Sequence, residues 1–149
     1  MGLSIAEIRP ADHEQWKALF TAYRAGYDTT AAEDERVLAT TWSWLTDDAD
    51  PTRALVAADG PTLVGFAHVR TYGRPSDART VVQLEDLFTA PEHRGRGVAR
   101  ALVGAVARIA AEEGHAVVRW TASQSNVGAL RLYDELAERS TRITYDLVP

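Results

Sequence analysis

The sequence predicts one domain of the α/β class, with a mixed sheet and helices. Some stretches alternate apolar and polar residues, as half-buried strands do, and others repeat apolar residues every three or four positions, as amphipathic helices do. The two kinds of stretch follow each other in the order β-α-α-β-β-β-α-β-α-β. The length of 149 residues is a common size for one domain. We therefore expect residues 1–149 to form a single domain.

The first half of the chain predicts three strands and two helices. Residues 3–9 alternate in the manner of a strand, and residues 12–25 carry the apolar stripe of a helix. A second helix is expected over residues 31–45. Asp59 and Gly60 form a strong hairpin signal, because this dipeptide suits the tight turn between two antiparallel strands.

The second half predicts a strand–helix–strand unit followed by one more helix and one more strand. The unit consists of a strand at residues 80–90, a helix at 95–113 and a strand at 116–122. A crossover helix of this kind joins two parallel strands of one sheet. The last two elements are a helix at residues 126–138 and a strand at 141–148.

The composition excludes several classes of function. There are 16 Lys and Arg against 21 Asp and Glu, so the formal charge of −5 disfavours nucleic acid and anionic membranes and suits a cationic partner. The chain has no cysteine, which removes disulfides, thiol catalysis and cysteine-based zinc sites. Its four histidines are dispersed without a metal-binding spacing, so we expect no metal.

The start of the chain gives an expectation about location. The stretch MGLSIAEIRP lacks the basic flank and the long apolar run of a signal peptide, and no run in the sequence approaches the roughly 18 apolar residues of a membrane span. We expect a cytoplasmic protein that does not enter a membrane.

The stretch HRGRGVAR, residues 93–100, concentrates positive charge and glycine directly before a predicted helix. The first amides of a helix lack partners and its dipole is positive there, so an anion is favoured at that point. Glycine allows the backbone to approach the anion closely. A P-loop would need a G-K-[ST] ending and a dinucleotide fingerprint would need G-x-G-x-x-G, and neither is present. The alternative is a solvated basic turn.

The hexapeptide RGRGVA, residues 94–99, resembles the R/Q-x-x-G-x-G/A signature of the GNAT superfamily of N-acetyltransferases. The resemblance implies acetyl-CoA as co-substrate, and a mixed sheet of about six to seven strands flanked by about four helices. It also implies that the loop holds the CoA pyrophosphate and that the preceding strand pairs with the pantetheine arm. The loop residues are Arg94, Gly95, Arg96, Gly97, Val98, Ala99 and Arg100, and the strand residues are Leu87, Phe88 and Thr89.

A second motif, NVGALRLY, begins the later helix. Asn126 and Tyr133 are seven residues apart, which places them only about 20° apart around a helix, with Ala129 close to both. In the GNAT pattern the Asn bonds the CoA arm, the small residue lets the arm pass and the Tyr protonates the departing sulfur. A tyrosine on an apolar helical face is more often part of the core. The Gly-aromatic turn that commonly follows this Tyr in the family is absent here.

The stretch LEDLF carries two carboxylates, Glu85 and Asp86, just before the proposed pantetheine strand. An amine with a pKa near 10.4 is about one part in 2,500 free base at pH 7, a deficit of about 4.6 kcal/mol that a base relieves. The motif looks most like the diamine (spermidine/spermine) acetyltransferases and related small-amine enzymes. That resemblance implies Glu85 as base, through water, and Asp86 as a receiver of the cationic substrate. Because side chains alternate along a strand, we expect the two to point to opposite faces. The alternative is an exposed acidic pair.

Aromatic residues of the first helices and the hairpin are candidates for the acceptor pocket, since aromatic faces attract ammonium groups. Tyr27 and Trp42 are the two residues we assign to substrate binding. Further candidates are Trp44, His68 and Trp120, although aromatic residues of this kind more often belong to the core.

These patterns together predict an acetyl-CoA-dependent N-acetyltransferase that moves an acetyl group directly to the primary amine of a small molecule or polyamine. Two alternatives remain open: acetylation of a protein N-terminus or lysine, and a non-catalytic acyl-CoA-binding module. The resemblance also allows a homodimer, because terminal strands in this family often help to form dimers.

Overall fold

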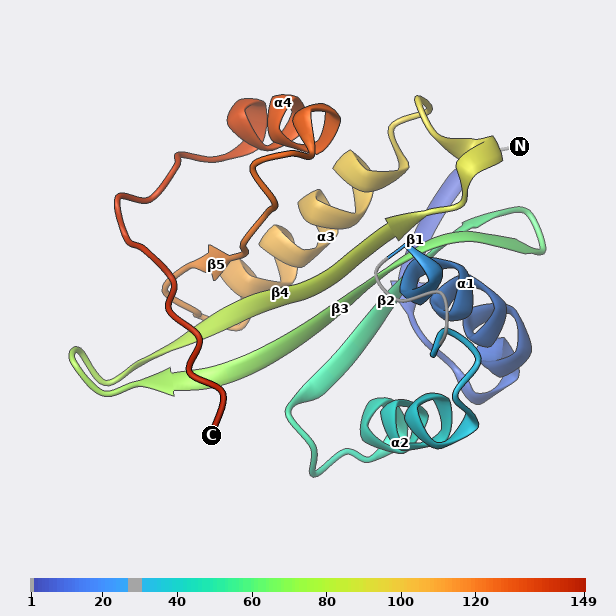
Figure 1. The fold of residues 1–149 in the computed structure, drawn as a ribbon, viewed down its shortest axis with the longest axis horizontal. Helices are drawn as coiled ribbons and strands as arrows, with labels where there is room; N and C mark the ends of the chain where they lie inside the picture. Colours follow the sequence, from blue (N-terminus) through green and yellow to red (C-terminus); the bar gives the residue numbers. More distant parts are fainter. Residues whose placement is uncertain (1, 27–30) are drawn as a thin grey trace.

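The computed structural model describes residues 2–26 and 31–149, and Figure 1 shows their arrangement. One sheet contains five strands in the order β1-β2-β3-β4-β5. The strands are β1 (Leu3–Glu7), β2 (Thr52–Asp59), β3 (Thr62–Arg74), β4 (Arg79–Thr89) and β5 (Val118–Arg119). The α-helices of the described residues are α1 (His13–Ala25), α2 (Glu35–Thr46), α3 (Val98–Glu112) and α4 (Val127–Leu136), with short 3-10 turns η1 (Pro10–Asp12) and η2 (Pro91–His93).

The sheet is mixed, as the sequence predicts. Neighbouring strands from β1 to β4 run antiparallel, whereas β4 and β5 are parallel and are joined through α3. The strand–helix–strand crossover is therefore confirmed. Helices α1 and α2 cover one face of the sheet. Helix α3 lies on the other face, and α4 lies on the same side of the sheet as α3 (Figure 1).

The two faces of the sheet hold different cores. On the α3 side the core is aliphatic, and Leu102 of α3 is completely buried against β3 and β4. On the α1 and α2 side it is aromatic, and Trp16 and Phe66 are completely buried there. The alternation of side chains along β3 produces this division, because successive residues face opposite sides.

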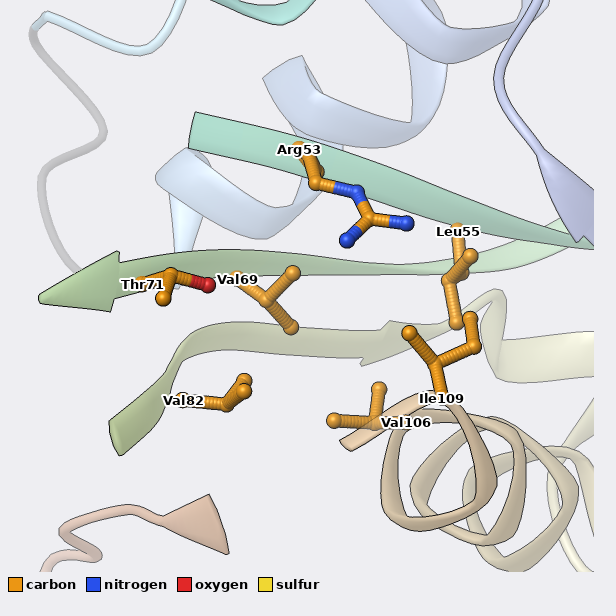
Figure 2. A pocket seen from close by; sticks show the side chains of 7 residues that line it. All are labelled: Arg53, Leu55, Val69, Thr71, Val82, Val106 and Ile109. Carbon is orange, nitrogen blue, oxygen red and sulfur yellow. The ribbon is translucent and has the colours of Figure 1, made fainter. Parts of the chain in front are cut away.

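A small hollow of about 10 Å³ remains between the sheet and α3 (Figure 2), about the space of one water molecule. Its lining is mostly aliphatic, with the guanidinium of Arg53 at one side. It is too small for a substrate and reflects local packing. The lining residues are Arg53, Leu55, Val69, Thr71, Val82, Val106 and Ile109.

Two predicted helices begin later than the sequence pattern suggests, for identifiable reasons. Helix α2 begins at Glu35 because the carboxylate of Asp34 accepts hydrogen bonds from the amides of Arg36 and Val37, which caps the helix. Helix α3 begins at Val98 because Gly97 has a left-handed backbone with φ of +81°.

The strand expected at residues 141–148 does not form, and within residues 2–26 and 31–149 the sheet has five strands rather than six to seven. Ile143, Tyr145 and Leu147 alternate as a strand would, yet their exposed fractions are 75%, 87% and 89%. Alternation gives a strand only where a neighbouring edge pairs with it, and β5 offers just two paired residues instead of the predicted 116–122. Among the described residues no helix is long and apolar enough to cross a membrane.

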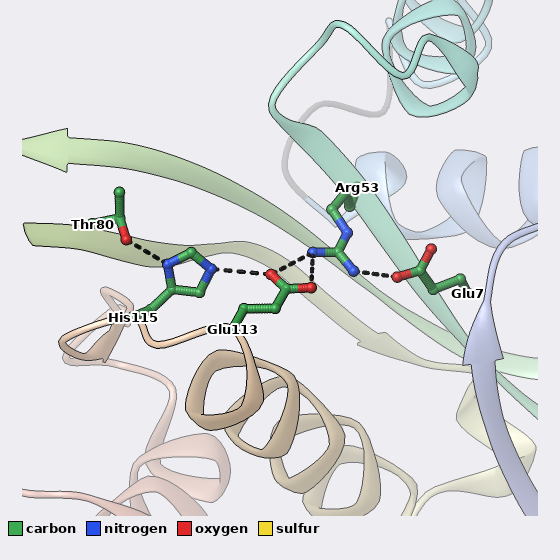
Figure 3. A network of polar contacts seen from close by, with 5 residues as sticks. All are labelled: Glu7, Arg53, Thr80, Glu113 and His115. Carbon is green, nitrogen blue, oxygen red and sulfur yellow. Dashed lines mark hydrogen bonds and ion pairs between the residues drawn. The ribbon is translucent and has the colours of Figure 1, made fainter.

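The C-terminal end of α3 is tied to three strands by a cluster of polar residues that we call the Arg53 cluster (Figure 3). Arg53 of β2 bonds both oxygens of Glu113 at 3.0 Å and also bonds Glu7 of β1. Glu113 contacts His115 at 3.1 Å, and His115 contacts Thr80 of β4 at 2.7 Å. The cluster thus connects β1, β2 and β4 to the end of the helix.

Candidate active site

A cleft opens where β4 and β5 part. The two strands pair only at Val82 with Val118 and at Gln83 with Arg119. From Leu84 onward the edge of β4 has no strand partner on that side among the described residues. The cleft there has a volume of about 340 Å³. It is lined by Tyr23, Leu84, Glu85, Leu87, Trp120, Thr121, Ala122, Ser123, Asn126 and Tyr133.

A β-bulge at Glu85 changes where the two carboxylates point. On β3, His68 pairs with Asp86 and the next residue, Val69, pairs with Leu84, so Glu85 is the extra residue. Asp86 contacts His68, and Glu85 contacts Arg70, which is two residues farther along β3 and on the same face. The expectation that the carboxylates face opposite sides is therefore wrong, because the bulge turns both toward the α1 side.

Glu85 forms an ion pair with Arg70. The Nη2 and Nε atoms of Arg70 lie 2.9 and 3.2 Å from Oε1 of Glu85. Both contacts use the same oxygen, and the carboxylate side chain is 40% exposed. The second oxygen, Oε2, remains the one on which a water molecule can be held.

Asp86 is the centre of a partly buried hydrogen-bond chain. The Tyr23 hydroxyl donates to Oδ1 of Asp86 at 2.7 Å, and the His68 ring lies 2.9 Å from Oδ2. Burial raises the pKa of the Asp86 carboxyl, but the hydrogen bonds from His68 and Tyr23 outweigh burial and lower this pKa below its usual value. Asp86 is therefore held as the carboxylate.

The opposite wall of the cleft comes from α4 and the segment before it. Asn126 is the N-cap of α4, and its Oδ1 accepts a hydrogen bond from the amide of Ala129 at 3.3 Å. Tyr133 packs edge-on against Trp120, with ring centroids 5.4 Å apart. Asn126 and Tyr133 both line the cleft, so the structure brings together the pair that helical spacing places on one face. Asn126 retains its amide NH₂ for a ligand while its oxygen caps the helix.

The start of α3 presents main-chain donors without a side-chain cap. Gly97 is the N-cap, no side chain of the described residues bonds the first amides, and no acidic residue lies in the first turn. Gly95 and Gly97 both have positive φ, +74° and +81°, which turns the chain sharply into the helix. This geometry suits a phosphate group, which would complete the hydrogen bonds of the first turn.

The three arginines beside these glycines have different surroundings. Arg94 donates from Nε to the carbonyl of Thr89 at 3.1 Å and stacks over the ring of Phe88, so it fixes the loop to the end of β4. Arg100 forms an ion pair with Glu135 of α4. Arg96 is exposed and, within the described part of the chain, has no such ion pair. Two of the predicted phosphate ligands thus also have a structural contact.

The aromatic candidates for the acceptor pocket lie in different parts of the molecule, and one of them lines the cleft. Trp120 lines the cleft. Trp42 packs in the core of α1 and α2, with ring centroids 5.0 Å from Trp16 and 4.5 Å from His13, and is not among the described residues that line the cleft. Trp44 is on the surface, with 47% of it exposed. Tyr27 lies outside the described residues.

Sequence reasoning missed several residues of the site, and Tyr23 and Arg70 are the two that contact its carboxylates. Tyr23 continues the apolar stripe of α1, which made it look like a core residue, and Arg70 gave no signal apart from its place on β3. The register of β3 against β4 reveals Arg70, and the packing of α1 on the sheet reveals Tyr23. Among the described residues no group of three or more His, Asp or Glu side chains could hold a metal ion.

A family model matches most of the chain: the one described as the acetyltransferase (GNAT) family covers residues 13–137. The chain belongs to this family. It is therefore an N-acetyltransferase that uses acetyl-CoA.

Individual GNAT proteins resemble the chain over nearly its whole length. The D-amino-acid N-acetyltransferase HPA3 of Saccharomyces cerevisiae is 29% identical over 143 residues, which cover 95% of this chain and 88% of that protein. The aminoglycoside N(6')-acetyltransferase type 1 of Salmonella enteritidis is 26% identical over 149 residues, which cover 96% and 97%. Three N-acetyltransferases of Rattus norvegicus are longer, and the chain spans 44%, 43% and 38% of their lengths.

A solved GNAT structure has the same fold. The aminoglycoside acetyltransferase AAC(6')-Iy, in complex with a bisubstrate analogue of CoA and acetylneamine, superimposes with a TM-score of 0.80 at 24% identity. The match covers 100% of this chain and 99% of that chain.

Proposed function

We propose that this enzyme transfers an acetyl group from acetyl-CoA to the primary amine of a small molecule, with polyamines as the leading acceptor class. One observation carries the proposal: the unpaired edge of β4 runs along a cleft of about 340 Å³ that holds Glu85 on one wall and Tyr133 on the other. A base and an acid on opposite walls suit a transfer that must remove a proton from the amine and return one to sulfur.

The residues assigned to acetyl-CoA follow this edge. Leu87, Phe88 and Thr89 offer main-chain groups to the pantetheine arm, as an added strand would use them. The loop of Arg94, Gly95, Arg96, Gly97, Val98, Ala99 and Arg100 receives the pyrophosphate, and its uncapped amides support this role. Asn126 and Ala129 contact the arm from α4. Acetyl-CoA, when bound, supplies the acetyl group as a reactive thioester.

Glu85 and Tyr133 then carry the proton transfers. Glu85, held by Arg70 through Oε1, takes the proton of the amine through a water on Oε2. A backbone N–H near Leu87 or Phe88 donates to the thioester carbonyl oxygen as its negative charge grows. Tyr133 gives its proton to the departing sulfur.

The acceptor side of the cleft is acidic. Asp86 is held as a carboxylate beside the cleft, and the chain as a whole carries a formal charge of −5, so a cationic amine is favoured over an anionic acceptor. The names of two relatives, a D-amino-acid and an aminoglycoside acetyltransferase, also support a small acceptor.

A thiol-release assay with acetyl-CoA tests the function. The acceptors are spermidine, putrescine, D-lysine, kanamycin and a lysine peptide, and we expect the small amines to give turnover. Turnover of the peptide alone would favour protein acetylation. Saturable CoA binding with no turnover would indicate a binding module.

Replacing Tyr133 tests the proton donor. We expect Tyr133→Phe to lower kcat about 100-fold or more, as loss of a general acid does, while KM for acetyl-CoA changes less than about threefold. Tyr145→Phe removes the same hydroxyl from a residue that is 87% exposed, and serves as the control. An equal change in kcat and in CoA affinity would contradict the acid role.

We also propose a homodimer. Ile143 and Leu147 form an apolar face on a segment that pairs with no strand in the described part of the chain. The edge of a second copy would cover this face. Sedimentation analysis of the wild type and of Leu147→Asp tests the proposal, and a monomeric wild type would contradict it.

A further inference from the structure

Tyr23 of α1 reaches the cleft from the face of the sheet opposite α3. Its ring is held among three phenylalanines, with centroid distances of 6.2 Å to Phe20, 5.7 Å to Phe66 and 6.0 Å to Phe88. These contacts leave the ring little freedom. The packing of the ring therefore fixes the position of its hydroxyl group in the cleft that Tyr133 and Glu85 also line.

The direction of each hydrogen bond behind Tyr23 follows from chemistry. The indole N–H of buried Trp16 lies 2.9 Å from Nε2 of His68, and an indole can only donate. Nε2 of His68 therefore accepts, and its ring carries the proton on Nδ1, where it donates to Oδ2 of Asp86. Asp86, as a carboxylate, can only accept, so the Tyr23 hydroxyl must donate to its Oδ1.

The geometry points to Tyr23 as an acceptor-binding residue: its proton is held by Asp86, so its phenol oxygen offers lone pairs to an N–H of the substrate amine. His68 and Trp16 are positioning residues that fix this orientation. The inference rests on the proposed function, because it concerns the amine that this function acetylates.

This arrangement also revises how Asp86 serves the acceptor. Both of its oxygens already have a partner, Tyr23 on one and His68 on the other, and only 28% of its side chain is exposed. A hydroxyl that donates to a carboxylate becomes a better acceptor itself, because hydrogen bonds in a chain polarise each other. Asp86 therefore attracts the ammonium group through Tyr23.

Replacing Tyr23 with phenylalanine tests the contact. The wild type is first assayed with spermidine, putrescine, D-lysine and kanamycin. Steady-state kinetics are then measured with the amine that gives the highest kcat/KM. We expect Tyr23→Phe to raise KM for that amine about tenfold, the size of a lost hydrogen bond to a charged group. KM for acetyl-CoA should stay within about twofold, and Tyr145→Phe should leave both constants unchanged.

Two substitutions of His68 test the positioning role. His68→Asn keeps an N–H near the place of Nδ1, so we expect the KM for the amine to stay within about threefold of the wild type. His68→Leu removes the donor, and we expect a rise of about tenfold, as for Tyr23→Phe. Thermal unfolding of both variants reports the loss of packing separately. Equal KM values for the Asn and Leu variants would overturn the positioning role.

The outcomes separate this inference from the proposed function. If the wild type acetylates one of these amines and Tyr23→Phe keeps its KM within about twofold, the role of Tyr23 is overturned and the proposed function stands. If the wild type acetylates none of them, the small-amine function fails and the role of Tyr23 falls with it.

Discussion

The two ends of helix α3 are built in opposite ways. At the C-terminal end, the amides of Gly114 and His115 bond the carbonyls of Ala111 and Ala110 in a Schellman motif, at 3.2 and 2.9 Å. The Arg53 cluster then ties this end to the strands (Figure 3). At the N-terminal end, Gly97 provides no side-chain cap and the first turn contains no acidic residue.

We infer from this difference that the C-terminal end of the helix serves stability and that the N-terminal end serves the CoA binding proposed above. Unpaired backbone groups at a helix end are satisfied by side chains, water or a ligand. The last turn of α3 obtains its partners from the chain itself, whereas the first turn keeps donors for an anion. A cap or an acidic residue at Gly97 would stabilise the free enzyme and would compete with the CoA phosphates.

The largest expected effect comes from breaking the N-terminal end. Gly97→Ala forces a side chain onto a residue with φ of +81°, which costs about 1–2 kcal/mol or reorients the amides. We expect the Kd of CoA, measured by calorimetry, to rise about tenfold because charged hydrogen bonds to phosphate are lost.

Gly104→Ala provides a matched control within the same helix. A Cβ at Gly104, as at Gly97, meets nothing within 4 Å, but Gly104 is inside the helix. The change should stabilise the protein by about 0.5–1 kcal/mol and leave CoA affinity unchanged. Equal effects of the two substitutions on CoA affinity would contradict the role given to Gly97.

A smaller effect is expected at the C-terminal end. Arg53→Met removes the guanidinium that bonds Glu7 and Glu113, and we expect the free energy of unfolding to fall by about 1 kcal/mol, less in high salt. CoA affinity should not change. Arg139→Met breaks the ion pair between Arg139 and Asp134. Because the Arg139 side chain is 68% exposed, this change should have almost no effect on stability. Urea unfolding measures both, and a loss of CoA affinity in Arg53→Met would contradict the division between the two ends.

The smallest effect concerns pH. The hydrogen bond from His115 lowers the pKa of Glu113, with Arg53 acting in the same sense against partial burial. A carboxyl with a lowered pKa stabilises the fold above its unfolded value of 4.5, and this contribution is lost as the pH falls through the folded value. Glu113→Gln should therefore be less stable than wild type by under about 1 kcal/mol at neutral pH, and this difference in stability should shrink as the pH falls below 4.5. A gap that persists in acid would show that the charge of Glu113 is not its cause.

Much of the fold could be predicted because it depends on local patterns. The stripe of α1 and the turn at Asp59 and Gly60 follow from residues close in sequence, and α3 lies within its predicted range. The strand at residues 141–148 could not be judged in this way, since its formation depends on an edge that β5 does not provide. Alternation identifies a strand that is able to pair, and pairing is a property of the whole sheet.

The residues of the site also differ in whether local sequence patterns predict them. Helical spacing placed Asn126 and Tyr133 together, and both line the cleft. The alternation rule failed at Glu85 because a bulge is set by the register between two strands. The hydrogen bond from Trp16 to His68 joins residues 52 positions apart, and no short motif announces it.

The parting of β4 and β5 has one more consequence. Tyr23 enters the gap from the layer of α1, and Tyr133 enters it from α4, on the far side of the sheet. The opening is thus a window through the sheet rather than a hollow on its surface. Under the proposed function, acetyl-CoA and the amine can approach from opposite faces of the sheet and meet in the plane of the strands.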